Sequence, residues 1–279
     1  MRVRTWLMRM FLILLVIVMI PAALLFFMQH SLIYYPRRYR PGYERSLPAG
    51  AQELRYTTAA GEQVAFYLPP RSGATQPARV WVTFSGNASV ALDWVVLVER
   101  NPNTADGFLL IDYPGYGASA GVASIATTRG SADQAVSILA ERLGVPENEL
   151  ASRLCVLGLS LGAGAALEFA AGHPIERAVL VAPFTTLREV AATLFTKPAS
   201  YLVRESYDNR TRLRELGQRT PPPRVAIFHG TEDTLIPIRM GEELARSVPD
   251  VAQFFAIKGA DHNTIASDAM PEIIAWMNH

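Results

Sequence analysis

The sequence predicts an α/β fold, with a mostly parallel eight-stranded sheet and helices on both faces. Three observations support this prediction. Two alternating runs come first, six short and almost wholly apolar runs come next, and longer helical stretches separate those six. Continuous apolar runs are typical of strands that helices cover on both faces. The 279 residues are enough for one large domain of this class.

The alternating runs at residues 52–58 and 63–68 predict an antiparallel hairpin. Six parallel strands are then expected at residues 80–84, 108–111, 154–157, 178–181, 225–228 and 254–257. Between them, helices are expected at residues 89–100, 125–143, 161–172, 240–247 and 263–277. The segment 184–223 is too long for a simple crossover and contains two helical stretches, 187–195 and 210–216. It is expected to form a lid or substrate wall over the carboxyl ends of the strands.

An uncharged apolar run extends from Met10 to Met28. As a helix it would be roughly 29 Å long, which matches the hydrocarbon core of a bilayer. A core helix of this length would normally show a polar stripe, and a cleaved signal peptide has a shorter apolar region. We therefore expect residues 1–30 to form an uncleaved single-pass anchor and residues 31–279 to form the folded domain.

Charges give little information about orientation in the membrane, because three arginines lie on each side of the apolar run. The precedent of signal anchors favours a cytoplasmic N-terminus and an extracytoplasmic domain. Three tyrosines come after the run, where they would either form an interfacial aromatic belt or pack under the first strands; they are Tyr34, Tyr35 and Tyr39.

Composition narrows the classes of partner and cofactor. The formal net charge is +1, so no strong field attracts nucleic acid. Cys155 is the single cysteine, which excludes an intrachain disulfide. The sequence shows no spaced cysteine and histidine cluster of the zinc-binding kind. We expect no metal and no cofactor.

Two segments match G-x-S-x-G, the pattern of a nucleophile elbow: residues 117–121 around Ser119 and residues 158–162 around Ser160. An elbow needs a strand before the serine and a helix directly after it. Ser160 comes after the apolar run 154–157 and precedes a small-residue helical stretch, whereas Ser119 lies in a turn-rich loop whose glycines indicate flexibility. Ser160 is therefore the predicted nucleophile.

A serine needs a base, and in this arrangement the order along the chain is serine, acid, histidine. His262 lies in a loop between the last strand and the last helix and is the predicted base. His173 is expected to cap a helix, His229 to support the loop after it, and His279 to be mobile at the C-terminus.

Asp233 is the predicted acid, because it comes after the preceding strand in the order that the triad requires. Glu232 is its near rival, and Asp261 is interpreted as a residue that shapes its own loop. An oxyanion hole needs two N–H donors. We expect the main-chain amides of Leu161 and Asn87 to supply them, with Ala88 as the alternative to Asn87.

These segments together resemble the α/β-hydrolase superfamily over nearly all of the chain past the anchor, and most closely its BEM46-like, or ABHD12/13/17-type, group. The resemblance depends on several motifs in order; they are residues 32–36, 85–88, 112–119, 158–162, 182–185, 229–233 and 259–262. It implies the α/β-hydrolase fold and a membrane-bound esterase or thioesterase that acts on a small-molecule or lipid acyl substrate without a cofactor.

One residue departs from the pattern of this group, which usually has histidine where Ser85 stands. The resemblance implies that this side chain shapes the oxyanion loop, so the hole or the substrate preference would differ here. Two other functions stay open from the sequence: a serine peptidase on the same fold, and a catalytically silent binding protein.

Overall fold

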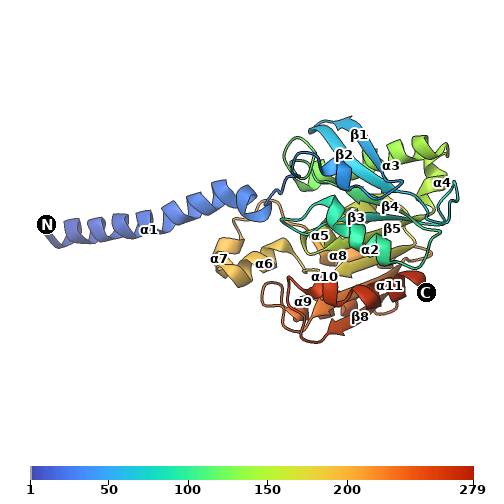
Figure 1. The fold of residues 1–279 in the computed structure, drawn as a ribbon. Coiled ribbons are helices and arrows are strands. Elements are labelled where there is room, and N and C mark those ends of the chain that lie inside the picture. Colours follow the sequence, from blue (N-terminus) through green and yellow to red (C-terminus); the bar gives the residue numbers. More distant parts are fainter. Residues whose placement is uncertain (1) are drawn as a thin grey trace.

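The computed structural model describes residues 2–279, whose strands form one eight-stranded sheet (Figure 1). The strands lie in the order β1-β2-β4-β3-β5-β6-β7-β8. The pairs β1–β2 and β2–β4 are antiparallel, and the remaining pairs are parallel, as the sequence predicts. Their bounds are β1 Gln52–Thr58, β2 Gly61–Leu68, β3 Val80–Phe84, β4 Gly107–Ile111, β5 Leu154–Leu159, β6 Arg177–Val181, β7 Arg224–Gly230 and β8 Ala252–Ile257.

Helices cover both faces of this sheet and bury two separate apolar clusters against it. One face carries η2 (Ala91–Trp94), α2 (Val95–Arg100), α10 (Ile265–Asp268) and α11 (Met270–Asn278). The other carries α3 (Ile125–Leu143), α5 (Leu161–Gly172), α8 (Asn209–Gly217) and α9 (Ile238–Ser247). This is the predicted layering, and it brings the loops after the parallel strands to one edge of the sheet.

Helix ends explain where the sequence-based bounds hold and where they do not. Helix α3 matches its prediction because Ser124 caps its first turn, accepting a hydrogen bond from the Thr127 amide, and Gly144 ends it with φ +66°. The predicted helix 263–277 is instead two helices, α10 and α11. Pro271 lies in the first turn of α11, where a missing N–H is tolerated but a continuing helix would lose a hydrogen bond.

Three short helices were not expected from the sequence: η1 (Tyr43–Ser46), α4 (Glu147–Ala151) and α7 (Lys197–Ser200). Helix α7 belongs to the 184–223 segment, together with α6 (Leu187–Leu194) and α8. Each of these three helices begins at a residue whose side chain caps it: Thr186, Thr196 and Asp208. Local capping therefore sets where the helices of this segment start. Figure 1 shows α6 and α7 beside the base of the N-terminal helix.

The N-terminal helix α1 (Arg2–Ile33) continues through Pro21 and projects from the body of the molecule (Figure 1). Its stretch Val3–Ile33 is long and apolar enough to cross a membrane, with a mean hydropathy of 3.1 over an 18-residue window, features that a signal sequence shares. The three tyrosines after it have different environments. Tyr34 is buried and Tyr39 stacks on Tyr43 against β2, while Tyr35 is exposed.

Candidate active site

Ser160 lies at the sharp turn between β5 and α5, at the carboxyl edge of the sheet. Its backbone has φ +55° and ψ −115°, a conformation that is strained for a residue with a side chain. The turn forms because its neighbours are glycines. A Cβ atom at Gly158 would collide with the Gly162 carbonyl, and one at Gly162 would collide with the Phe84 carbonyl. The strand–turn–helix context expected around Ser160 is therefore present.

The structure brings Ser160, His262 and Asp233 into one line of hydrogen bonds. The Oγ atom of Ser160 lies 3.0 Å from Nε2 of His262, and Nδ1 of His262 lies 2.7 Å from Oδ2 of Asp233. The Asp233 side chain is fully buried, and that of His262 is 15% exposed. An ionised Asp233 accepts a hydrogen bond from the Nδ1–H group of His262, which leaves Nε2 as an acceptor facing the serine hydroxyl.

The loop around Asp233 favours its ionised form. Burial by itself raises the pKa of this carboxyl, but hydrogen bonds from His262 and the Ile236 amide, together with the nearby His229 ring, outweigh burial and hold the pKa well below its usual range. The Leu235 amide donates to the same oxygen, Oδ1, at 3.0 Å. A carboxylate with this many donors stays charged at neutral pH and keeps the orientation of the imidazole fixed.

His229 supports the loop that carries Asp233, as the sequence suggests. Its Nε2 donates to the Ile236 carbonyl at 2.7 Å and lies 3.6 Å from Oδ2 of Asp233. The side chain is fully buried, and its Nδ1 has no hydrogen-bond partner. The ring therefore holds the loop that carries the carboxylate and does not reach the serine.

The rival residues have other contacts. Glu232 is exposed, and Asp261 accepts hydrogen bonds from the amides of Asn263 and Thr264 within its own loop. His173 caps α5 at the opposite end of this helix from the elbow, and it pairs with Asp133 at 2.8 Å. The exposed C-terminal residue His279 makes a main-chain bond to Trp276.

The second G-x-S-x-G segment is built into the protein interior. Ser119 is fully buried; its Oγ accepts from the Val64 amide at 2.9 Å and lies 3.4 Å from the Asp112 carbonyl. The interpretation of its glycines as flexible is wrong. A Cβ atom at Gly117 would collide with the Asp112 carboxylate, and one at Gly121 would collide with the Ala60 carbonyl. These glycines permit close packing.

Asn87, in the loop after β3, faces the same cavity as Leu161, so both expected oxyanion donors border it. The sequence did not suggest what the Asn87 side chain does. Its Nδ2 donates to the Ile33 carbonyl at 2.8 Å, and its Oδ1 accepts from the Tyr35 amide at 2.8 Å. The amide thus connects this loop to the end of α1. Ser85 is buried, and its hydroxyl donates to the Val90 carbonyl within the loop.

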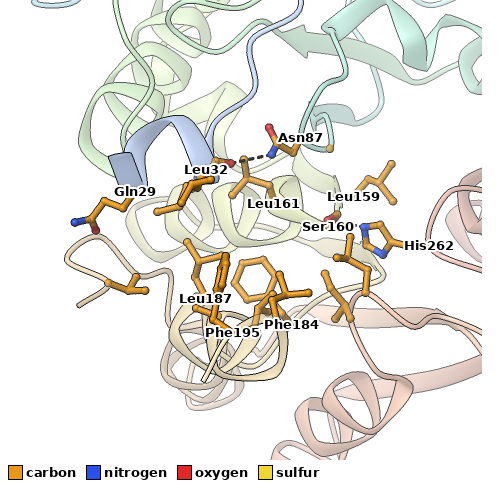
Figure 2. A pocket seen from close by; sticks show the side chains of 18 of the residues that line it. Gln29, Leu32, Asn87, Leu159, Ser160, Leu161, Phe184, Leu187, Phe195 and His262 are labelled. Atoms are coloured by element: carbon orange, nitrogen blue, oxygen red, sulfur yellow. Dashed lines mark hydrogen bonds between the residues drawn. The ribbon is translucent and has the colours of Figure 1, made fainter. Parts of the chain in front are cut away.

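A cavity of about 380 Å³ opens above Ser160 and His262. Its size is in the range of small-molecule sites, and its lining is mostly apolar. Figure 2 shows Leu187, Phe184 and Phe195 facing Leu161 and Ser160 across the cavity, with Leu32 and Gln29 of α1 at one side. The contribution of α1 was missed, because an uninterrupted apolar run hides which of its residues face the domain.

The arrangement of strands and helices defines a class of fold: the chain has the α/β-hydrolase fold. No family model matches the chain. Among solved structures, it resembles a Pyrococcus furiosus esterase, with a TM-score of 0.65 and 16% identity, over 88% of this chain and 96% of the esterase. A puromycin-hydrolyzing peptidase of Mycobacterium tuberculosis matches with a TM-score of 0.60 and 17% identity, over 80% of this chain and 37% of the peptidase.

Relatives found by sequence are more similar to the chain than these solved structures. The chain is 28% identical over 237 residues to the uncharacterized protein Rv2307c of Mycobacterium tuberculosis, covering 84% of this chain and 80% of that protein. It is 29% identical over 252 residues to the uncharacterized protein YfhR of Salmonella typhi, covering 82% and 79%. Mouse α/β hydrolase domain-containing protein 17C is 28% identical over 155 residues, 55% of this chain and 44% of that protein.

Proposed function

We propose that the chain is a membrane-anchored serine hydrolase that cleaves carboxylic esters or thioesters through an acyl-enzyme. The observation that carries the proposal is the line of hydrogen bonds from Ser160 through His262 to Asp233, which opens onto an apolar cavity. A serine hydroxyl is a weak nucleophile until a neighbouring base accepts its proton. The buried, ionised Asp233 supports His262 as that base.

In the first half of the reaction, Oγ of Ser160 attacks the acyl carbonyl carbon while Nε2 of His262 takes the hydroxyl proton. The tetrahedral intermediate collapses, the imidazolium gives its proton to the departing alcohol or thiol, and the acyl group stays on Ser160. A water molecule then attacks the acyl carbon and passes one proton to His262. The bond from the acyl carbon to Oγ of Ser160 breaks, the imidazolium returns its proton to Oγ, and the acid is released. Asp233 stabilises the imidazolium in both halves.

The oxyanion of each tetrahedral intermediate needs two donors. We assign them to the main-chain amides of Leu161 and Asn87, which come from the start of α5 and the loop after β3. The free N–H groups at the start of α5 also favour negative charge at this point. Residues 1–30 serve as the single-pass anchor, residues 31–279 form the catalytic domain outside the cytoplasm, and the 184–223 segment forms the lid.

A fluorophosphonate probe tests this function, because it labels a serine only where an assembled triad activates it. We expect the wild-type protein and Ser119→Ala to label, and Ser160→Ala not to label. Absence of labelling in the wild type would support a silent binding protein instead. A panel of esters, thioesters and aminoacyl amides, assayed on the labelling-competent protein, then separates esterase from thioesterase and peptidase.

A further inference from the structure

The α1 helix has two parts that differ in burial. Every residue from Val3 to Ile20 is exposed, a stretch that extends roughly 27 Å at the helical rise. Beyond Pro21, one face is half-buried while the residues between stay exposed. The spacing of that face matches the helical repeat, so it packs on the domain; its members are Ala22, Leu25, Phe26, Gln29 and Ile33.

Polar contacts fix this second part of α1 to the domain. The Gln29 side chain accepts a hydrogen bond from the Arg204 amide at 2.8 Å, and the Arg204 guanidinium lies 5.2 Å from the centre of the Phe26 ring. On another side, Nε2 of His30 donates to the Ala123 carbonyl at 2.8 Å. Together with Asn87 at its C-terminal end, these contacts hold α1 against both the 184–223 segment and the oxyanion loop.

The docked part of α1 forms one wall of the cavity above Ser160. Leu25, Gln29, Leu32 and Ile33 line the cavity from α1, opposite α6 and the loop after it (Figure 2). The body of the domain supplies the floor. A bound acyl chain would therefore contact residues of the anchor helix itself as it extends away from the serine.

The opening of the cavity is apolar. Some lining residues are also about half exposed, which places them at the mouth: Leu32 is 53% exposed, Leu194 51% and Phe195 51%. Large exposed apolar groups gathered at one place are typical of surfaces that contact a lipid or a protein. Figure 1 shows α6 and α7 beside the base of α1, on the side from which the exposed part of α1 projects. If that part spans a bilayer, the cavity mouth lies on the side that faces the membrane.

We infer that the last turns of α1 are part of an acyl-binding pocket, and that the substrate is a long-chain acyl ester resident in the membrane. Its chain enters between Leu32 of α1 and the rim formed by Leu194 and Phe195, and its carbonyl reaches Ser160. This inference rests on the proposed serine hydrolase function and adds the class of substrate and the source of one wall of its pocket. The covalent steps are those given above, with the long acyl group transferred to Ser160.

Two adjacent leucines of α1 allow a matched test on the full-length protein. Leu25 lines the cavity, whereas Leu24 is 54% exposed and does not line it. We compare Leu25→Trp with Leu24→Trp by the ratio of kcat/KM for a p-nitrophenyl palmitate to that for the acetate. Tryptophan at position 25 fills space that a long chain needs, so we expect this ratio to fall at least about tenfold. The ratio should stay within about twofold of wild type for Leu24→Trp.

Equal ratios in the two variants would overturn the inference, because α1 would then not contact the acyl chain. Such a result leaves the proposed function intact as long as acetate hydrolysis depends on Ser160. Conversely, if wild type hydrolyses neither ester, the proposed function fails first. Fluorophosphonate labelling of both leucine variants reports whether the site has folded, independently of chain length.

A second measurement uses the wild-type protein alone and identifies the source of the substrate. Full-length protein is reconstituted into phosphatidylcholine vesicles that contain a fluorogenic palmitoyl ester, or is mixed with separate vesicles that contain it. We expect hydrolysis to be at least about tenfold faster when enzyme and ester share a bilayer, since the chain then enters directly from the membrane. Equal rates would show delivery through water and overturn the membrane part of the inference.

Discussion

The two G-x-S-x-G segments share a pattern but have opposite roles in the structure. Both serine hydroxyls make hydrogen bonds, but with different partners. Ser119 is bonded to the main chain of β2, whereas Ser160 is bonded to an imidazole. Both segments also need their glycines, because added side chains would collide with backbone or carboxylate atoms in each. Glycine at the two flanking positions therefore does not distinguish a nucleophile elbow from a tightly packed loop.

The difference lies in the stretch of chain after each serine and in the aspartate nearby. A helix begins directly after Ser160, whereas the chain after Ser119 turns through Gly121 before α3 starts at Ile125. Asp233 is ionised through its histidine partners, while burial dominates at Asp112 and raises its pKa to about 6. In the proposed function the first segment takes part in proton transfer, whereas the second is bonded and packed within the protein interior.

The largest effect we predict comes from removing the charge of Asp233, which holds the histidine that faces Ser160. Asp233→Asn should lower kcat for ester hydrolysis by roughly 10⁴-fold, because an amide donates to Nδ1 and selects the wrong tautomer of His262. The neighbouring exposed carboxylate provides the control: Glu232→Gln should stay within about twofold. Steady-state kinetics on a soluble short-chain ester checks both. Equal losses in the two variants would contradict the assignment of the acid.

The strands and the elbow could be predicted from sequence because their signals are local. Apolar runs mark strands buried on both faces, and the serine between a strand and a small-residue helix marks the turn. The order of serine, acid and histidine along the chain then leads to Asp233 and His262, which the structure brings within hydrogen-bonding distance of each other. These features depend on residues close in sequence and on one rule of topology.

Other features depend on contacts that the sequence does not record. The packed face of α1 lies within a uniformly apolar run, so Leu25 and Leu24 look alike until the fold separates them. The Asn87 side chain reaches main chain more than fifty positions away. The glycines around Ser119 were misread as flexible because their close contacts come from Asp112 and from the β1–β2 turn at Ala60.

A smaller effect, on stability, should appear at the other serine. Ser119→Ala leaves the Val64 amide without the partner that it has at 2.9 Å, inside the core. A buried donor without a partner costs about 1–3 kcal/mol of unfolding free energy. We expect urea denaturation to show this loss while kcat for a short-chain ester stays within about twofold of wild type. A loss of activity that exceeds the loss of folded protein would mean that Ser119 takes part in the reaction.

The aspartates of the two regions predict opposite pH dependences. Asp112 has a folded pKa of about 6, above its ordinary value of 3.8, so the folded state holds this proton longer than the unfolded chain. Its contribution to stability is present below about pH 4 and is lost as pH rises toward about 6, a change on the order of 3 kcal/mol. Asp233, with a lowered pKa, contributes stability that is gained above about pH 4 and lost on acidification.

The variant Asp112→Asn isolates the first of these contributions, since a neutral amide has no proton to lose. Between about pH 4.5 and 6.5 the contribution of Asp233 is nearly constant. As pH rises through this range, the unfolding free energy of Asp112→Asn should therefore increase relative to that of wild type. Chemical denaturation at several pH values measures it. A difference that does not change with pH would mean that the donors Ala91, Ala118 and Tyr39 keep Asp112 ionised in the fold.

The smallest predicted effect is the difference in stability between a glycine and an alanine variant, and its sign should be opposite at the two serines. Outside glycine, positive φ occurs among the described residues at Ala88, Ser160 and Ala182, so Ser119 has an ordinary backbone. Glycine accepts φ +55° without strain, and the relief exceeds its entropic disadvantage. Ser160→Gly should therefore be more stable than Ser160→Ala by about 1 kcal/mol, while Ser119→Gly should be less stable than Ser119→Ala by about 0.5–1 kcal/mol. Thermal denaturation of the four variants measures both differences, and the same sign at both positions would mean that the turn at Ser160 stores no strain.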